Sequence, residues 1–146
     1  MIRKISAHYI FPVSKPPVKF GIIVCSENGE ILDVIDNKGV FKEVSSLEFY
    51  DGILVPGFIK TDFESDQIIL ERMKARQSQE SALSLEDIVK WVTLDMAGIT
   101  KEDHILGSFE KGKFPGVYLI NKIDFTCLKL TAGSQVKNLL PLFEKK

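Results

Sequence analysis

The sequence predicts a mainly β domain with two helices, an α+β fold class. Runs rich in β-branched and aromatic residues, separated by turn residues, occupy both ends of the chain, whereas helical periodicity is confined to the middle. A chain of 146 residues is long enough for one domain with a real hydrophobic core. We therefore expect a single domain, 1–146, made of N-terminal strands (1–58), a helical segment (61–98) and C-terminal strands (104–146).

Composition and charge narrow the class of protein. Hydrophobic residues make up 45% of the chain, charged residues 27%, and the net charge is −1, which is typical of a soluble globular domain. We expect no nucleic-acid partner and no membrane partner, since there is no basic surface charge and no apolar run of roughly 20 residues. The first 13 residues lack a signal-peptide pattern, which favours a cytoplasmic location.

The N-terminal third is predicted to be a β-meander. Strands are expected over residues 2–11 and 18–26, and the dipeptide Asn28-Gly29 predicts a hairpin with a type I′ turn into a strand over 31–35. Residues 36–39 form a further turn signal. Two short strands, 47–50 and 53–55, are expected on either side of Asp51-Gly52.

The first helix has two possible starts. Thr61 is one possible N-cap, because Glu64 three residues later would complete a capping box. Ser65 is the alternative N-cap. Apolar residues from Ile68 to Met73 give the helix a short buried face, and the polar stretch 77–82 is predicted to be a loop.

The second helix is the clearest element. Ser84 is its expected N-cap, acidic residues fill its first turn, and Gly98 is its expected end. Apolar residues recur at helical spacing, and two large ones make the apolar face wider than a single stripe. The residues of this wide face are Trp91, Val92, Leu94 and Met96.

The C-terminal part is predicted to return to strands, over residues 105–109, 117–120, 125–130 and 135–140. Cys25 and Cys127 both fall in predicted strands. Two distant thiols make neither a disulfide framework nor a zinc-ligand spacing, so we expect both to be buried and reduced.

Two motifs carry a resemblance to a known family. Val55-Pro56-Gly57-Phe58 resembles the V-P-G-F-[IV]-[ND]-x-H-x-H junction that leads into the catalytic barrel of the amidohydrolase superfamily. The segment 106–113, followed by Pro115-Gly116, resembles that family's G-S-x-x-x-G-K turn back into its sheet. The strands over 5–12 and 22–34 are similar to those of its cytosine deaminase, chlorohydrolase and aminodeoxyfutalosine deaminase branch.

The resemblance implies a composite β-sandwich without its barrel. In the family, the two chain ends form a small sandwich beside a metal-binding (β/α)8 barrel, which takes about 200 residues. Only roughly 25 residues separate Phe58 from Ser84 here. The expected fold is therefore the composite-domain sandwich of the metal-dependent hydrolases, with no barrel.

The family implies zinc or iron, held by the paired histidines of the junction motif. In one alignment those two positions are Asp62 and Glu64. In the other alignment, which we favour, Thr61-Asp62 matches the T-D at the end of the last barrel strand, where the aspartate is a metal ligand. Asp62 and Glu64 are thus weak candidates for metal ligands. Together with Asp66, Asp62 and Glu64 are also typical of the first turn of a helix, where acidic side chains are favoured.

A catalytic zinc site needs three protein ligands and a water, and the ligands usually include histidine. The chain has only His8 and His104, on separate predicted elements, and Ser108 lies outside any nucleophile-elbow motif. The basic turn Lys111-Gly112-Lys113 is explained by the resemblance as a tight turn. We therefore predict no catalytic residues, no bound metal and no cofactor.

The wide helical face leads to the functional hypothesis. Without a barrel, the face formed by Trp91, Val92, Leu94 and Met96 either folds onto the sandwich or is covered by a second copy or another protein. The favoured function is a non-catalytic amidohydrolase-like domain for protein interaction or self-association, as a homodimer or with a protein partner. The alternative is a metal-dependent hydrolase of carbon–nitrogen bonds, split or with a rebuilt site. A third possibility is a small-molecule binder with a groove between sandwich and helices.

Overall fold

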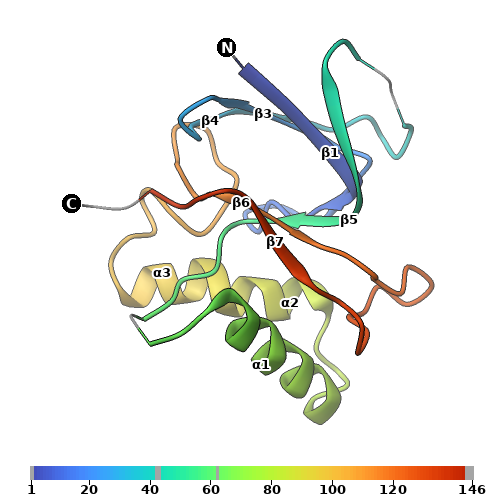
Figure 1. Cartoon of the computed structure of the whole chain (residues 1–146), viewed down its shortest axis with the longest axis vertical. Coiled ribbons are helices and arrows are strands. Elements are labelled where there is room, and N and C mark those ends of the chain that lie inside the picture. The colour runs from blue at the N-terminus through green and yellow to red at the C-terminus, as the bar shows by residue number, and fades with distance from the viewer. Residues whose placement is uncertain (1, 42–43, 62, 144–146) are drawn as a thin grey trace.

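A computed structural model describes residues 2–41, 44–61 and 63–143, and it confirms an α+β fold without a (β/α)8 barrel (Figure 1). Seven strands in these residues form one mixed sheet in the order β4-β3-β1-β5-β6-β7, and β2 also pairs with β1. The strands are β1 (Ile2–Ile10), β2 (Val18–Lys19), β3 (Ile22–Ser26), β4 (Ile31–Ile35), β5 (Leu47–Val55), β6 (Val117–Ile120) and β7 (Val136–Leu140). The helical elements are α1 (Asp66–Gln79), α2 (Leu85–Lys90), the π-helical segment η1 (Trp91–Asp95) and α3 (Met96–Ile99).

The N-terminal strands do not form the predicted meander. Strand β5 crosses past β3 and β4 and pairs in parallel with the far edge of β1, from Lys4 opposite Leu47 to Ile10 opposite Leu54. Its last residues pair antiparallel with β6. Alternation of apolar residues indicates which faces are buried but not which strand edge is paired, so the sequence order alone was misleading.

Strand β5 is continuous where the sequence predicted two short strands. Its register on β1 shifts opposite His8, so that residues 51 and 52 form a bulge. Gly52 has φ +140°, and a Cβ there would lie 2.3 Å from the carbonyl oxygen of Ile120. Only glycine fits this position, because both the backbone conformation and the approach of β6 exclude a side chain.

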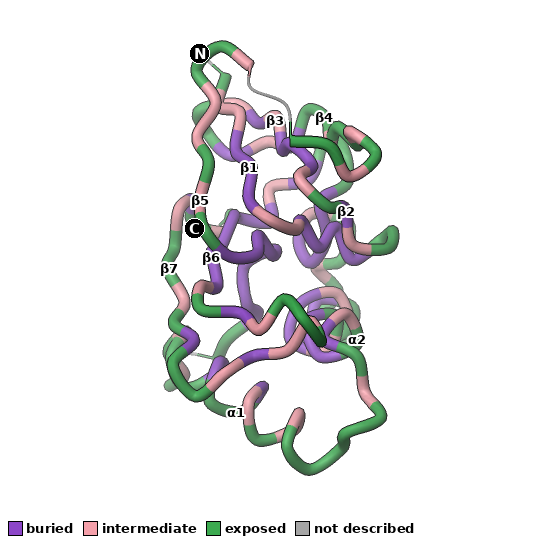
Figure 2. Tube along the Cα trace, turned by 90° about the vertical axis from the view of Figure 1, so that its right-hand side faces the viewer, coloured by how far each residue is buried: buried purple, intermediate pink, exposed green. Residues whose placement is uncertain are grey.

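The sheet bends and packs on itself, so one continuous sheet takes the place of the two sheets expected for a sandwich. Side chains of β5 and β6 alternate between two cores, as the period of two requires. Ile53 and Tyr118 face the helices, whereas Leu54 and Leu119 face β1 and β3. Figure 2 shows the buried trace between the strands and the helices.

The hairpin between β3 and β4 is confirmed, but its turn differs from the predicted type I′. Gly29 has φ +96° and donates its N–H to the Ser26 carbonyl, whereas Asn28 has no positive φ. A register shift beside Cys25 accommodates the longer loop. The predicted strand over 18–26 is divided into β2 and β3 by Phe20, which has φ +54°.

Helix α1 begins at Ser65, the second of the two predicted caps, whose Oγ accepts from the Ile68 N–H. The Glu64 carboxylate accepts from the Thr61 N–H as in a capping box, but the Glu64 N–H donates to the Thr61 carbonyl and not to its Oγ1, so these contacts only close a turn. The helix continues to Gln79, so the predicted loop over 77–82 begins too early.

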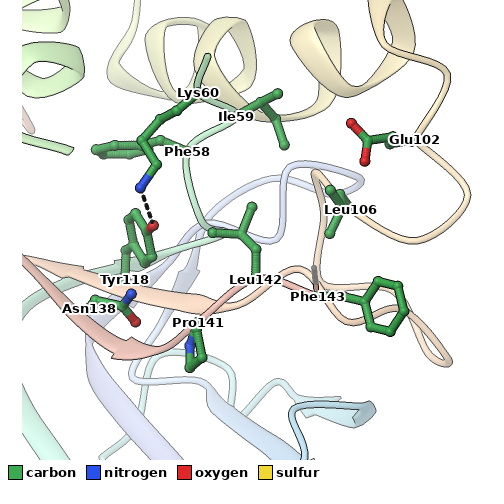
Figure 3. A pocket seen from close by; sticks show the side chains of 10 residues that line it. All are labelled: Phe58, Ile59, Lys60, Glu102, Leu106, Tyr118, Asn138, Pro141, Leu142 and Phe143. Carbon is green, nitrogen blue, oxygen red and sulfur yellow. Dashed lines mark hydrogen bonds between the residues drawn. The ribbon is translucent and has the colours of Figure 1, made fainter. Parts of the chain in front are cut away.

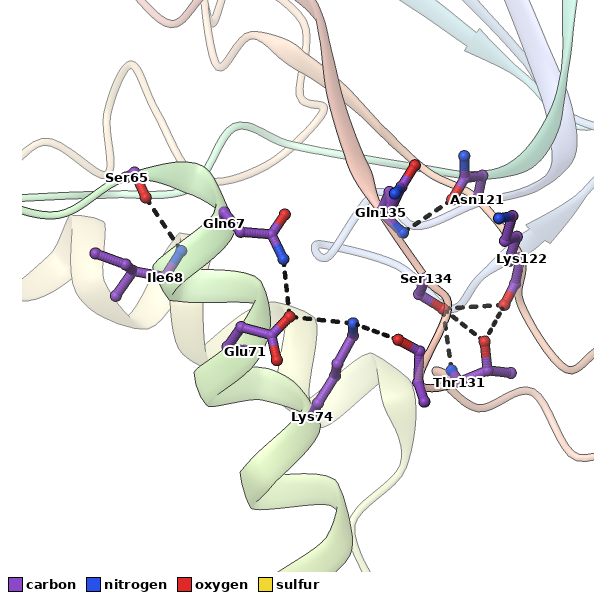
Figure 4. Close-up of polar contacts among 11 residues, drawn as sticks. Ser65, Gln67, Ile68, Glu71, Lys74, Asn121, Lys122, Thr131, Ser134 and Gln135 are labelled. Atoms are coloured by element: carbon purple, nitrogen blue, oxygen red, sulfur yellow. Dashed lines mark hydrogen bonds and ion pairs between the residues drawn. The ribbon is translucent and has the colours of Figure 1, made fainter.

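Polar contacts explain why α1 is longer than its apolar pattern indicated. Gln77 exchanges two hydrogen bonds, each 2.9 Å, with the backbone of Leu130. Lys74 donates to Glu71 and to the Ala132 carbonyl, in the loop that Thr131 and Ser134 brace (Figure 4). The C-terminal part of α1 is therefore held by a loop far away in sequence.

Helix α2 begins as predicted, with a capping box between Ser84 and Asp87. The following π-helical segment frees the Val92 carbonyl, which accepts the N–H of Ile59 at 3.0 Å. The helix ends after Ile99 with Lys101 at φ +61°, so Lys101 and not Gly98 is the left-handed residue of the C-cap.

Two of the predicted C-terminal strands are loops. In residues 105–109 the backbone bonds to irregular partners, such as the Phe109 N–H to the Pro12 carbonyl. In residues 125–130 only an isolated bridge from Asp124 to Lys129 remains. Cys25 is buried as predicted, but Cys127 is exposed because it lies on this second loop. Strands β6 and β7 are confirmed.

Two glycine substitutions test the role of the bulge. We expect Gly52→Ala to lower the free energy of unfolding by about 2 to 4 kcal/mol, because its Cβ meets the β6 backbone and φ is left-handed. Gly98→Ala is the matched control, since no atom lies within 4 Å of its added Cβ. The control is expected to stabilise the helix by up to about 1 kcal/mol in urea unfolding. Equal effects at the two sites would show that the bulge tolerates a side chain.

Candidate functional site

A cleft of about 500 Å³ opens where the segment after β5 passes the C-terminal end of the described chain (Figure 3). It lies between the sheet and the helices, where the third functional possibility expected a groove. Six of its ten lining residues are apolar, and the other four carry polar side chains. The lining residues are Phe58, Ile59, Lys60, Glu102, Leu106, Tyr118, Asn138, Pro141, Leu142 and Phe143.

One end of this cleft is polar. The Lys60 ammonium donates to the Asp66 carboxylate at 2.5 Å and to the Tyr118 hydroxyl at 3.2 Å. It also lies 5.7 Å from the centre of the Tyr118 ring. The charge of Lys60 is thus already compensated by Asp66, which leaves Glu102 as the other charged group of the lining.

The polar side chains that line the cleft are Lys60, Glu102, Tyr118 and Asn138. Its lining residues, all of them in the described part of the chain, include no histidine and no cysteine. Its lysine is engaged by a carboxylate, so it is not placed as a free base or nucleophile. The arrangement supports non-covalent contact with a ligand or a neighbouring surface.

Of the two candidate metal ligands, only Glu64 belongs to the described residues. Asp62 lies outside the described residues. Glu64 accepts from the Thr61 N–H at 2.9 Å and forms an ion pair with Arg72, so it serves the turn before α1. His8 and His104 lie on β1 and in an exposed loop. Across residues 2–41, 44–61 and 63–143, no three His, Cys, Asp or Glu side chains gather into a metal-binding group.

The Gly-Ser turn near residue 110 is structural, as its resemblance to the family's turn implied. Buried Ser108 donates to Glu110 at 2.6 Å and accepts from Lys113 at 2.8 Å. The hydrogen bond from Ser108 and the adjacent Lys113 ammonium lower the pKa of Glu110. Gly112 and Lys113 also exchange backbone bonds with Ile31, so the turn holds the start of β4.

The wide helical face divides between core and surface. Val92 is buried in the core, whereas Trp91, Leu94 and Met96 are half-buried. The Arg76 guanidinium covers one side of the Trp91 ring at 4.5 Å. Part of this face therefore folds onto the domain, which was one of the two expected outcomes, and its role as an interface stays a prediction.

The sequence did not predict a group of exposed and half-buried aromatic rings. We call it the aromatic cluster, and it consists of His8, Phe20, Phe41, Phe49 and Phe125. His8 lies 5.4 Å from Phe49 and 4.7 Å from Phe125, measured between ring centres. These residues come from distant segments, so no local pattern joins them. The one sequence signal is that His8 and Phe49 both fall in predicted strands, 2–11 and 47–50.

None of the helices in the described residues has the length and apolar character needed to span a bilayer.

Comparisons with known proteins give little further information. No protein-family model matches the sequence, and no curated protein matches it. Among solved structures, one similar chain is the ochratoxinase of A. niger, with a TM-score of 0.32 and 19% sequence identity. The match covers 53% of this chain and 21% of the ochratoxinase chain. A similarity of this size establishes neither a family nor a function.

The turn at Glu110 predicts a specific pH dependence of stability. Because the pKa of Glu110 is lowered in the folded state, its stabilising contribution is complete above the ordinary glutamate pKa and is lost as pH falls through the lowered value. We expect Glu110→Gln to flatten the fall in unfolding free energy between about pH 5 and pH 3. Ser108→Ala removes the hydrogen bond that lowers the pKa of Glu110 most. In this variant the fall in unfolding free energy should therefore end at a higher pH. Unchanged profiles in both variants would contradict the assignment.

Metal analysis tests the hydrolase alternative. We expect purified protein, incubated with zinc or iron and then dialysed, to keep less than one metal per chain, because Glu64 is engaged by Arg72 and the Thr61 backbone. Elemental analysis by mass spectrometry gives the ratio. Stoichiometric metal that is lost in Glu64→Gln but kept in Glu71→Gln would revive the alternative.

Proposed function

We propose that this chain is a non-catalytic interaction module that binds a protein partner through one face of its helical segment. We call this the helical face and define it by Phe63, Ile68, Trp91, Met96 and Ile99. The observation that carries the proposal is exposure of large apolar side chains in this region: Phe63 is 95% exposed, Ile99 73% and Ile68 43%.

Two members of the helical face, Trp91 and Met96, line the same hollow. The loop before α1 runs beside α3 (Figure 1), and a small hollow of about 60 Å³ is lined by residues of both, including Glu64 and Met96. Trp91 lines this hollow and a wider open one of about 610 Å³ beside Arg76. Single exposed apolar residues are normal, but several around an aromatic residue are typical of protein interfaces.

The sequence resemblance supports the same face. In the amidohydrolases that the chain resembles, the corresponding helix packs against the barrel. A chain that retains the composite domain alone exposes the apolar side chains that the barrel would cover, and burying them yields about 25 cal/mol per Å². A protein partner would supply that cover. The alternative of a carbon–nitrogen hydrolase rests on the resemblance alone.

Site-specific photo-crosslinking tests this proposal. A benzophenone amino acid placed at Phe63 is expected to give a discrete protein adduct in cells, whereas the same group at Val40, exposed on another part of the chain, gives none. Excess wild-type protein should compete the adduct away. The competitor variant Ile68→Glu/Ile99→Lys should be at least about tenfold weaker, because it places charge in the apolar contact.

The two substitutions are chosen to preserve the fold. Both residues are exposed, and a glutamate in the first turn and a lysine in the last turn suit the helix dipoles. The unfolding free energy is therefore expected to change by no more than about 0.5 kcal/mol. An adduct that the variant competes as well as the wild type, or no adduct at all, would overturn the proposal.

A further inference from the structure

We propose that the aromatic cluster is the contact surface of a homodimer, in which two copies of the chain meet across a two-fold axis. The cluster is separate from the helical face, so this inference goes beyond the proposed function and does not depend on it. A dimer formed here would carry two helical faces.

The cluster lies on the outer face of the sheet. On β1, the side chains of Ile5 and Ala7 point into the core. Successive side chains of a strand point to opposite faces, so His8 lies on the other face of the sheet. On β5, Phe49 is paired with β1, and one further residue separates it from the bulge opposite His8. Phe41 is 48% exposed, Phe49 40% and Phe125 37%, so three phenylalanine rings share one solvent-facing region.

The rings form a fixed platform and not a set of loose side chains. Phe41 and Phe49 meet edge to face at 5.2 Å, and Phe20 meets Phe41 edge to face at 5.9 Å. The Gly52 backbone N–H donates to His8 Nδ1 at 3.3 Å and fixes the ring beside the bulge. Ordering such a surface on binding costs little side-chain entropy, which favours its use as an interface.

The charges beside the cluster are what indicate a second copy. The Lys19 ammonium lies 5.8 Å from the centre of the Phe20 ring, and the Asp51 carboxylate lies 3.3 Å from His8 Nδ1. Lys19 and Asp51 are both exposed residues, so each presents its charge to solvent beside the rings. A uniformly acidic or basic partner would meet a like charge at one of them.

A two-fold arrangement satisfies both charges at once. A two-fold axis repeats every contact with the two copies exchanged. In the proposed dimer, Lys19 of each copy therefore faces Asp51 of the other. The net charge of −1 leaves little overall repulsion between copies. An interface of standard size buries about 800 Å² per copy, about a tenth of the 8003 Å² surface.

Light scattering over a roughly hundredfold range of concentration is expected to show the mass rise from one chain to two. Phe49→Ser should raise the dimer dissociation constant about tenfold or more, because it removes a central ring. The helical-face variant Ile99→Lys is the matched control and should dimerise like the wild type. If no dimer forms while crosslinking at the helical face is unchanged, the dimer inference is overturned and the proposed function is not.

Charge reversal gives a second test that does not depend on folding of one variant. Lys19→Glu and Asp51→Lys should each raise the dissociation constant about tenfold, since each puts like charges opposite one another twice. An equimolar mixture of the two variants restores both opposite-charge pairs, and the double variant Lys19→Glu/Asp51→Lys restores them within one chain. Both are expected to dimerise at wild-type strength.

The outcomes separate cleanly. Restoration in the mixture supports the two-fold contact, including the pairing of Lys19 with Asp51. The inference is overturned if the wild type stays monomeric throughout, if Phe49→Ser and Ile99→Lys behave alike, or if the mixture remains as weak as each variant alone.

Discussion

Strand β5 pairs with β1 along one edge and with β6 along the other, and the bulge at Gly52 allows it to do both. The bulge places Leu54 in the core beside β1 while Ile53 and Val55 face the helices. Without it, the side chains of one half of the strand would point to the wrong core. The sheet, both cores and the outer aromatic rings all depend on this one irregular position.

The helical segment is attached to this sheet by irregular backbone contacts. The Val92 carbonyl, freed by the π-helical segment, accepts from Ile59 just after β5. Gly107, at φ +93°, lets its loop approach the helix so closely that an added Cβ would lie 2.8 Å from the Leu94 Cα. These contacts fix how far the helices cover the sheet, and hence which part of their apolar face stays exposed.

The polar groups of the described chain are mostly engaged in holding structure. Glu64 closes a turn, Lys60 is paired with Asp66, and Ser108 binds Glu110 and Lys113. Large apolar side chains are exposed in two other regions, the helical face and the aromatic cluster.

The sequence by itself determined the α+β class, the lack of room for a barrel, the hairpin at Asn28-Gly29 and the cap at Ser84. These follow from local rules of periodicity, turn chemistry and capping, which act over a few residues. Tertiary structure alone decided the parallel pairing of β5, the length of α1 and the meeting of His8 with Phe49 and Phe125. Those features depend on contacts between residues far apart in the chain, and no short-range pattern encodes which distant segments will meet.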